Sequence, residues 1–330
     1  MPHDQRATSL LHLPKCWTAS CHLRLATFSA CVRSTVRTIV DEFAHLHRHL
    51  LVAPTEPAHV TLSLFAQRRV TPQAGSQRRL RYVLLEEDDL LYTTSNRREL
   101  VPELEMALAC CLVEHLSDYL QLHAGAVVKR GVGLLVVGPP GAGKTTLVCT
   151  LLAHGFSYLA DEVVFLEVPS LRILPYYRAL SIKAGSLDPL RPFLPRLSAG
   201  GYHIKEEKGP FWYVNPLDVV SQADRGAQGE SGAAPARLGA GAPLRAILLP
   251  QLAAQPAAPS LEPMPRSLML RHLANQLVRL PAPRVPSFEA LLRLVERCAC
   301  FTLRSGEAPA TAALVAQLVD RLAATPETGS

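Results

Sequence analysis

The apolar and polar positions in the first half of the chain mark out three short β-rich segments before any longer period appears. These segments are rich in β-branched, aromatic and other apolar residues, which predicts β-strands, and they cover residues 59–65, 79–87 and 89–95. An acidic tip around Glu87 and Asp88 separates the last two segments. Because charged residues are readily solvated in a turn, we expect these two strands to form a hairpin.

A helical period follows this hairpin. From Glu99 onward, apolar residues recur every three or four positions, which places one apolar stripe along a long helix. The stripe consists of Val101, Leu104, Leu108, Leu112, His115, Leu116 and Tyr119. Because His115 lies on this stripe, we expect it to be a core histidine.

The centre of the chain predicts two strands, a short helix and a further β-rich segment. Residues 124–129 and 132–137 are β-rich and separated by a tight turn, so they form a hairpin or adjacent strands. The second of them is apolar almost throughout, as expected for a strand buried on both faces of a sheet. A short helix that ends at Gly155 comes next, and residues 156–168 are again β-rich.

The last third of the chain predicts a mixture of strands and helices after a low-complexity tract. Residues 221–243 consist largely of Gly, Ala, Ser and Pro, a composition that buries little surface, so we expect a disordered surface insertion. The expected strands are 244–250 and 300–306, and the expected helices are 265–280, 287–297 and 308–323.

Composition narrows the class of protein. The chain has 330 residues, of which 48% are apolar and 19% charged, so it is globular and long enough for two domains. No apolar run reaches the ~18 residues of a membrane-spanning helix, and the net charge of +6 is scattered. We therefore predict neither a membrane nor a nucleic-acid partner. Eight cysteines are too few for a disulfide scaffold, and the adjacent Cys110 and Cys111 suit a reducing compartment, so we expect a cytoplasmic protein.

Residues 1–40 stand apart in composition. They contain several Arg, Lys, Ser and Thr residues and a single acid, which is similar to an organellar transit peptide. No clean amphipathic period accompanies this composition, so we expect a poorly ordered segment. Cys16, Cys21 and His22 lack the paired spacing of a zinc site, and we predict no metal there.

The segment after the apolar strand carries the strongest motif. Residues 138–146 read GPPGAGKTT and match the pattern GxxxxGK[ST]. In this pattern, backbone N–H groups and a helix N-terminus surround a polyphosphate, the lysine reaches the β- and γ-phosphates, and the hydroxyl ligates Mg²⁺. We predict that Lys144 and Thr145 take those two roles. The expected nucleotide-binding residues are Gly138, Pro139, Pro140, Gly141, Ala142, Gly143, Lys144, Thr145 and Thr146.

Two acids and a histidine are candidates for the chemistry. Asp161 and Glu162 lie 17 and 18 residues after Lys144, where a short helix would return the chain to the loop. Phosphoryl transfer needs a metal ligand and often a carboxylate that takes the acceptor's proton. Adjacent residues on an ideal strand point to opposite faces, so both acids can serve only at a bend or a strand end. His123 precedes the 124–129 strand and is placed to face the same phosphates.

These motifs, taken in order, resemble a known family. LHAGAVV (122–128), VGLLVVGPPGAGKTTL (132–147) and LLAHGFSYLADEVVFLE (151–167) resemble the core of the HPr kinase/phosphorylase catalytic domain. The resemblance is strong over residues 121–168 and diffuse to about residue 325. It implies ATP and Mg²⁺ as cofactors, with His123, Lys144, Asp161 and Glu162 as catalytic residues and Thr145 and Asp161 as metal ligands. HPr kinases assemble into hexamers, so a homo-oligomer is among the partners the resemblance suggests.

The sequence also departs from the family. Glu162 stands where the well-known members have Asp, which moves the carboxylate by about one methylene. The signature loop that follows the acids in the bifunctional enzymes is not found, so the resemblance does not extend to phosphorylase activity or to HPr as the acceptor. PYYRALSIKAG (175–185) is similar to a segment of HPr kinase-related proteins of unassigned substrate.

Cations and a further loop complete the candidates. Arg178 and Lys183 are cations that can approach phosphates or an acceptor's charge, and we count Arg178 among the nucleotide-binding residues. By default both are solvated strand residues. Residues 201–216 contain His203, Lys205, Lys208 and Trp212, which suggest a lid or an acceptor-binding loop.

The sequence thus predicts an α/β fold, a mixed sheet flanked by helices, in an HPr kinase-like P-loop catalytic domain preceded by a small α+β domain. We place a poorly ordered segment at 1–40, the α+β domain with its long final helix at 41–120 and the nucleotide-binding domain at 121–325. The predicted function is phosphoryl transfer to a hydroxyl of a peptide, a protein or a small molecule. Two alternatives are a nucleotide-binding regulatory or assembly protein without catalysis and a carboxykinase-like kinase of small metabolites.

Overall fold

The computed structural model divides the chain into two units. The first comprises residues 1–115 and 200–211, and the second comprises residues 116–199 and 212–330. The division therefore falls five residues before the boundary expected at 120, and a short later segment belongs to the first unit. The structure describes residues 13–54, 57–70, 78–168, 170–195, 197, 202, 209–220, 236–252, 258–279 and 287–325.

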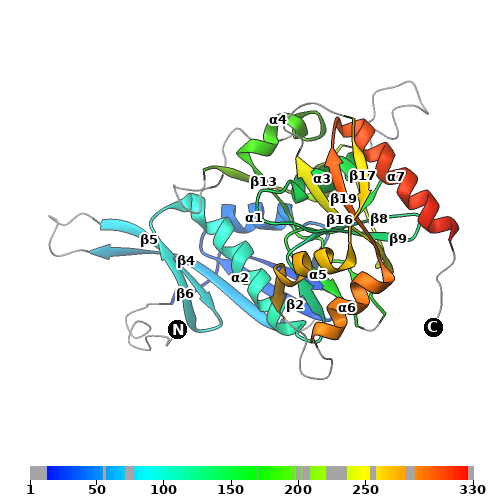
Figure 1. Ribbon diagram of the computed structural model, residues 1–330. Helices are drawn as coiled ribbons and strands as arrows, with labels where there is room; N and C mark the ends of the chain where they lie inside the picture. The colour runs from blue at the N-terminus through cyan, green and yellow to red at the C-terminus, as the bar shows by residue number, and fades with distance from the viewer. Residues whose placement is uncertain are drawn as a thin grey trace. The chain divides into compact units, whose positions relative to one another are not determined.

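The first unit is built on a six-stranded sheet with two helices (Figure 1). The strand order is β3-β1-β2-β4-β5-β6, and β2 and β4 are parallel while the other pairs are antiparallel. Strands 59–65, 79–87 and 89–95 of the sequence prediction are confirmed, and the last two form the expected hairpin. The elements are β1 (Ala19–Leu25), β2 (Phe28–Ser34), α1 (Arg37–Leu46), β3 (Leu51–Val52), β4 (Val60–Val70), β5 (Arg78–Glu86), β6 (Asp89–Thr94), η2 (Arg97–Glu99) and α2 (Leu100–His115).

The prediction of a poorly ordered segment over residues 1–40 was wrong for its second half. Residues 19–34 form the antiparallel pair β1 and β2, and residues 1–12 lie outside the described residues. Every second side chain of the pair is buried, which is the period of a half-buried strand. These side chains are Cys21, Leu23, Leu25, Phe28, Ala30, Val32 and Ser34. The prediction of disorder followed the basic composition of the segment and not this alternation.

The prediction for the end of the long helix was also wrong. Helix α2 ends at His115, four residues before the end of the apolar stripe. His115 is exposed rather than part of the core, because it lies in the last turn of the helix. Its ring packs on Phe28 with 5.2 Å between centroids and on His59 with 4.7 Å.

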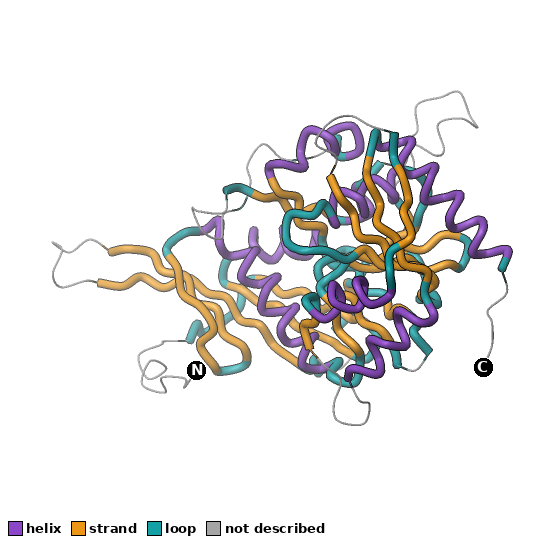
Figure 2. Tube along the Cα trace, in the orientation of Figure 1, coloured by secondary structure: helices purple, strands orange, loops and turns teal. Residues whose placement is uncertain are grey.

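The second unit contains a seven-stranded mixed sheet flanked by helices, so the coarse α/β prediction is confirmed (Figures 1 and 2). The strand order is β15-β10-β8-β9-β16-β19-β17, in which β9, β16 and β19 are parallel. The predicted hairpin of β8 and β9 is present. The strands of this sheet are β8 (Gly125–Lys129), β9 (Val132–Val136), β10 (Ser157–Ala160), β15 (Arg237–Leu238), β16 (Leu244–Leu252), β17 (Ser260–Pro263) and β19 (Ala299–Ser305).

Smaller elements complete this unit. The four-stranded sheet has the order β12-β11-β7-β18, and β13 pairs with β14. These strands are β7 (Leu120–Leu122), β11 (Val164–Leu166), β12 (Ile173–Leu174), β13 (Leu180–Lys183), β14 (Phe211–Val214) and β18 (Leu277–Arg279). The helices are α3 (Lys144–Ala153), α4 (Leu187–Leu190), α5 (Arg266–Ala274), α6 (Ser287–Arg297) and α7 (Ala308–Ala324), with short 3₁₀ turns at η3 (Ala184–Ser186), η4 (Arg191–Phe193) and η6 (Pro216–Asp218).

The core of this unit explains why its central strands are apolar on both faces. Leu134 and Val136 of β9 join one buried cluster with side chains of α3 and α7. Leu135, on the opposite face of β9, is also fully buried. A strand covered on both faces needs apolar residues at successive positions, as predicted for 132–137.

Two predictions for this unit need correction. The helix expected over 265–280 ends at Ala274, and residues 277–279 form β18 because they pair with β7. The disordered insertion expected over 221–243 is too long. Residues 236–243 include β15 and the buried Ala236, whereas residues 221–235 lie outside the described residues.

Two further findings bear on the class of protein. In the part of the chain that the structure describes, no helix is both long enough and apolar enough to cross a membrane. All eight cysteines are free thiols.

Candidate functional site

The glycine loop, residues 138–143, connects the buried strand β9 to the first residue of helix α3. The order of strand, glycine loop, helix and strand is the one that the sequence predicts. Gly141 and Gly143 have φ angles of 86° and 89°, a region that residues with a Cβ rarely adopt. The glycines therefore allow the loop to turn sharply, and its backbone leads directly into the N-terminus of α3, where N–H groups lack helical partners.

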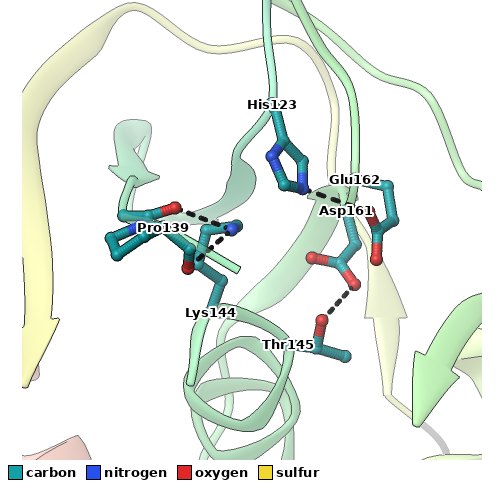
Figure 3. A network of polar contacts seen from close by, with 7 residues as sticks. His123, Pro139, Lys144, Thr145, Asp161 and Glu162 are labelled. Atoms are coloured by element: carbon teal, nitrogen blue, oxygen red, sulfur yellow. Dashed lines mark hydrogen bonds and ion pairs between the residues drawn. The ribbon is translucent and has the colours of Figure 1, made fainter. Parts of the chain in front are cut away.

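Lys144 is the first residue of α3, and its ammonium group lies inside the loop. Its Nζ donates to the carbonyl oxygen of Gly138 at 2.8 Å and to that of Pro139 at 3.5 Å (Figure 3). Burial lowers the pKa of Lys144, while the nearby charges of Glu162 and Asp161 act in the opposite direction. The cation is thus held over the loop by two neutral oxygens.

Asp161 is the buried acid of the site. Its Oδ2 accepts a hydrogen bond of 2.8 Å from the hydroxyl of Thr145, one residue into α3 (Figure 3). The residue is 1% exposed, and its Oδ1 has no hydrogen-bond partner among the described residues. Burial, followed by the charge of Glu162, raises the pKa of Asp161 to about 7, against the hydrogen bond from Thr145.

A distorted connection between two strands allows Asp161 and Glu162 to serve the same site. The pairing of β10 with β8 shifts register between Tyr158 and Ala160, just before the acids. The N–H of Val163 then donates to the carbonyl oxygen of Asp161 at 2.9 Å, and Glu162 between them has a φ of 69°. This tight turn is strained for a residue with a side chain. The 156–168 segment is therefore two strands in different sheets, β10 and β11, with the two acids at the turn between them.

Glu162 forms a hydrogen bond with His123. Their Oε2 and Nε2 atoms are 3.2 Å apart, and each side chain is 30% exposed (Figure 3). The hydrogen bond from His123 lowers the pKa of Glu162 to about 2, with further help from the charges of Arg178 and Lys144 and against the effect of burial. The backbone N–H of His123 donates to the carbonyl oxygen of Gln276 at 2.7 Å, which fixes the backbone of the histidine just after β7.

Arg178 is buried, contrary to the default of a solvated strand residue. It precedes β13, and its carbonyl oxygen accepts a hydrogen bond of 2.9 Å from the hydroxyl of Tyr158. Its charge lowers the pKa of Glu162, so its guanidinium contributes to the electrostatics of the acids. The structure therefore brings Arg178 to the site that the sequence assigned to it.

Other candidates are placed less centrally. Thr146 donates to the hydroxyl of Ser186 at 2.8 Å, so its own hydroxyl is engaged beside the loop. Lys183 is exposed at the end of β13, and its positive charge contributes to the lowered pKa of Lys144. Trp212 lies in β14, whereas His203, Lys205 and Lys208 of the expected lid or acceptor-binding loop lie outside the described residues.

The sequence analysis missed three residues that shape the site. Gly125 in β8 makes room for the acid, because a Cβ there would lie 3.2 Å from Asp161 Oδ1 and 2.6 Å from Val148 Cγ2. The small residues of the AGAVV strand were a signal for this close approach. Tyr158 and Ser186 had no local signal, since their partners are 20 and 40 residues away in sequence.

The described residues contain no cluster of three or more His, Cys, Asp or Glu side chains suited to hold a metal ion. A cation beside Thr145 and Asp161 would therefore need further oxygen ligands from a bound phosphate and from water. Mg²⁺ is commonly held in this way, with one or two protein ligands and the remainder from the substrate.

The fold and the site together define an α/β protein in which a glycine loop and a helix N-terminus face a buried carboxylate. Comparison of the chain with models of known protein families finds no matching family, and no curated protein matches it. Function is therefore inferred from the residues of the site and their geometry.

Proposed function

We propose that this protein is an ATP- and Mg²⁺-dependent phosphotransferase with an HPr kinase-like P-loop domain. Its acceptor is a hydroxyl of a peptide, a protein or a small molecule. The observation that carries the proposal is the contact between Thr145, at the start of the helix after the glycine loop, and the buried Asp161, whose second oxygen has no described partner. A carboxylate buried with an unused oxygen beside a hydroxyl suits a divalent cation.

The loop and Lys144 would bind the phosphates. The ammonium group now donates to two neutral carbonyl oxygens, which hold a cation more weakly than a phosphate oxygen does. A nucleotide can therefore draw Lys144 from them. Positive charge from Lys144 and from the helix N-terminus then neutralises the charge on the transferring phosphoryl group, which accounts for most catalysis of this reaction.

Thr145 and Asp161 fit the expected Mg²⁺ ion. Hydroxyl and carboxylate oxygens are the ligands Mg²⁺ prefers, and the remaining ligands would be phosphate and water. When bound, Mg²⁺ supplies charge neutralisation between the phosphates. It also compensates the cost of ionising Asp161 in a buried site, the same cost that raises the pKa of this carboxyl.

The acceptor hydroxyl is expected to meet His123 rather than Asp161. Asp161 is 1% exposed, whereas the His123 and Glu162 side chains are each 30% exposed. Nε2 of His123 faces Glu162, and its Nδ1 has no partner among the described residues. An imidazole nitrogen without a hydrogen-bond partner is a suitable proton acceptor when a carboxylate orients the other ring nitrogen. Glu162, whose pKa is low, would stay ionised and hold the ring in place.

Turnover of γ-labelled ATP by the full chain tests the proposal. Purified protein with Mg²⁺ should release ADP or label an acceptor that mass spectrometry can identify from a peptide library, a lysate or a panel of small alcohols and acids. We expect Lys144→Ala and Asp161→Asn each to reduce turnover by about 10²-fold or more. Lys15→Ala and Asp188→Asn are the matched controls. They alter exposed residues of the same types and should leave the turnover unchanged.

Two outcomes would contradict the proposal. If ATP binds but the wild type shows no turnover with any acceptor, and Asp161→Asn binds ATP as the wild type does, the protein is a nucleotide-binding module without catalysis. If labelled phosphate appears only on the carboxyl groups of small acids, the carboxykinase-like alternative gains, and a hydroxyl acceptor is excluded.

A further inference from the structure

Arginines gather at one end of the six-stranded sheet of the first unit. β2, β4 and β6 run in the same direction, so their last residues and the first residue of β5 lie at the same end. Residues 67–70 and 78–81 pair only with each other, so β4 and β5 continue past β2 and β6 as a two-stranded ribbon. The arginine surface, as we name it, comprises Arg33, Arg37, Arg68, Arg81, Arg97 and Arg98. It includes both faces of this end of the sheet, because the register places Arg33 and Arg81 on one face and Arg68 on the other.

Four of these arginines are held in place by neutral oxygens rather than by carboxylates. The hydroxyls of Ser63, Thr93 and Thr38 and the carbonyl oxygen of Thr18 accept one hydrogen bond each. The donors, in the same order, are Arg33, Arg81, Arg97 and Arg37. None of the six arginines forms an ion pair with a carboxylate that the structure describes. Most of their donors therefore remain available to an anion, while the side chains are already oriented.

Glu99, the acid that follows Arg97 and Arg98, accepts hydrogen bonds from the Tyr92 hydroxyl and from the Asn96 amide. It forms no ion pair with either arginine among the described residues.

Arg81, near the start of β5, belongs to the arginine surface, whereas the acids Glu86 to Asp89 lie at the other end of the strand. The arginines therefore contribute positive charge at this end of the sheet, which favours an anionic partner.

We propose that the arginine surface binds a segment of a polypeptide partner rich in Asp and Glu. Guanidinium groups pair with carboxylates through two parallel hydrogen bonds, which favours arginine over lysine for this purpose. Single-stranded nucleic acid usually also needs aromatic rings on which bases stack. In the described part of this sheet end the rings are occupied. Arg33 lies 4.5 Å above Trp17, whose edge contacts Phe65, and Tyr92 is tied to Glu99.

The proposal concerns the first unit alone, so it does not depend on the kinase activity. The test is fluorescence anisotropy of a labelled oligo-glutamate peptide with the full chain, at low and at moderate salt. We expect binding that weakens with salt and that falls by about tenfold in the double variant Arg68→Glu/Arg98→Glu, because two surface contacts become repulsive. Arg271→Glu reverses an exposed charge on α5 and should bind as the wild type does.

Circular dichroism and thermal unfolding verify that the double variant is folded. Arg68→Lys/Arg98→Lys keeps both charges but loses the paired hydrogen bonds, so it should bind more weakly than the wild type and more tightly than the double reversal. Absence of oligo-glutamate binding by the wild type would overturn the proposal, as would equal binding by the double reversal. A labelled oligothymidylate that binds tighter than oligo-glutamate and is lost in the same double variant would overturn it in favour of nucleic acid.

Discussion

At the scale of single residues, the site depends on one acid held in an unfavourable environment. Asp161 is buried, one of its oxygens lacks a hydrogen bond from any described residue, and its neighbour Glu162 is an ionised acid in a strained turn. A protein that only needed a stable core would place an amide or an apolar residue there. This cost is what a cation between Thr145 and Asp161 would relieve.

The raised pKa of Asp161 has a consequence for stability. Between about pH 4 and pH 7 the folded protein keeps the proton on this carboxyl, while the unfolded chain loses it. The folded state therefore binds more protons, so the free energy of unfolding falls as the pH rises through this window and stays low above it. Asp161→Asn removes the titrating carboxyl and therefore the fall in the free energy of unfolding that it causes. Without nucleotide or Mg²⁺, we expect the variant to be more stable than the wild type at pH 8 by roughly 1–4 kcal/mol.

Chemical denaturation at pH 5 and at pH 8 measures this difference. The gain from Asp161→Asn should be larger at pH 8 than at pH 5, and Asp188→Asn, an exposed residue of α4, should follow the wild type at both values. An Asp161→Asn variant that is less stable than the wild type at pH 8 would show that the buried carboxylate is not destabilising.

At the scale of elements, the close approach of β8 to α3 brings the acid to the helix. Gly125 of β8 lies against Val148 of α3 and against Asp161 Oδ1, with no room for a methyl group. The space left by the missing side chain is filled by the carboxylate itself. The strand, the helix and the acid therefore have to be considered as one packed group.

Replacing this glycine tests that packing. A Cβ in Gly125→Ala would lie 2.6 Å from Val148 Cγ2, so strand and helix must move apart, at a cost of about 1–3 kcal/mol. Gly185→Ala is the matched control, because a Cβ there meets no atom within 4 Å. Thermal unfolding of both variants should show a clear loss for Gly125→Ala and little change for Gly185→Ala. Equal midpoints would mean that the contact is not tight.

Strands and helices with a clear period could be predicted from the sequence, and so could the residues of the loop. The errors share a physical cause. Residues 19–34 have the alternation of strands, but their basic composition suggested disorder. Residues 277–279 are a strand because they pair with β7, a contact that helical spacing over 265–280 does not reveal. Pairing between distant segments outweighs local preference in such cases.

The candidate site shows the same limit. Lys144, Thr145 and the two acids follow from the motif and its spacing. Two adjacent acids can face one site only at a bend, and the turn at Glu162 is such a bend. The burial of Arg178 could not be read from its neighbours in the sequence, because it results from packing against distant segments, and even its carbonyl oxygen bonds to Tyr158, 20 residues earlier in the chain.

At the scale of the whole molecule, the two units carry different chemistry. Every residue of the candidate site, from His123 to Arg178, belongs to the second unit. The arginine surface belongs to the first. The two proposals can therefore fail separately: loss of oligo-glutamate binding leaves the site intact, and loss of turnover leaves the arginine surface intact.

The central claim is that Asp161 and Thr145 hold a cation together with the phosphates of ATP. Isothermal titration of ATP into the full chain, with and without Mg²⁺, tests it most directly when wild type and Asp161→Asn are compared. We predict that Mg²⁺ tightens ATP binding to the wild type by about tenfold or more, because a carboxylate–cation contact contributes more than ~1.4 kcal/mol. Asp161→Asn should lose most of this gain and still bind metal-free ATP. An equal effect of Mg²⁺ on both proteins would contradict the account.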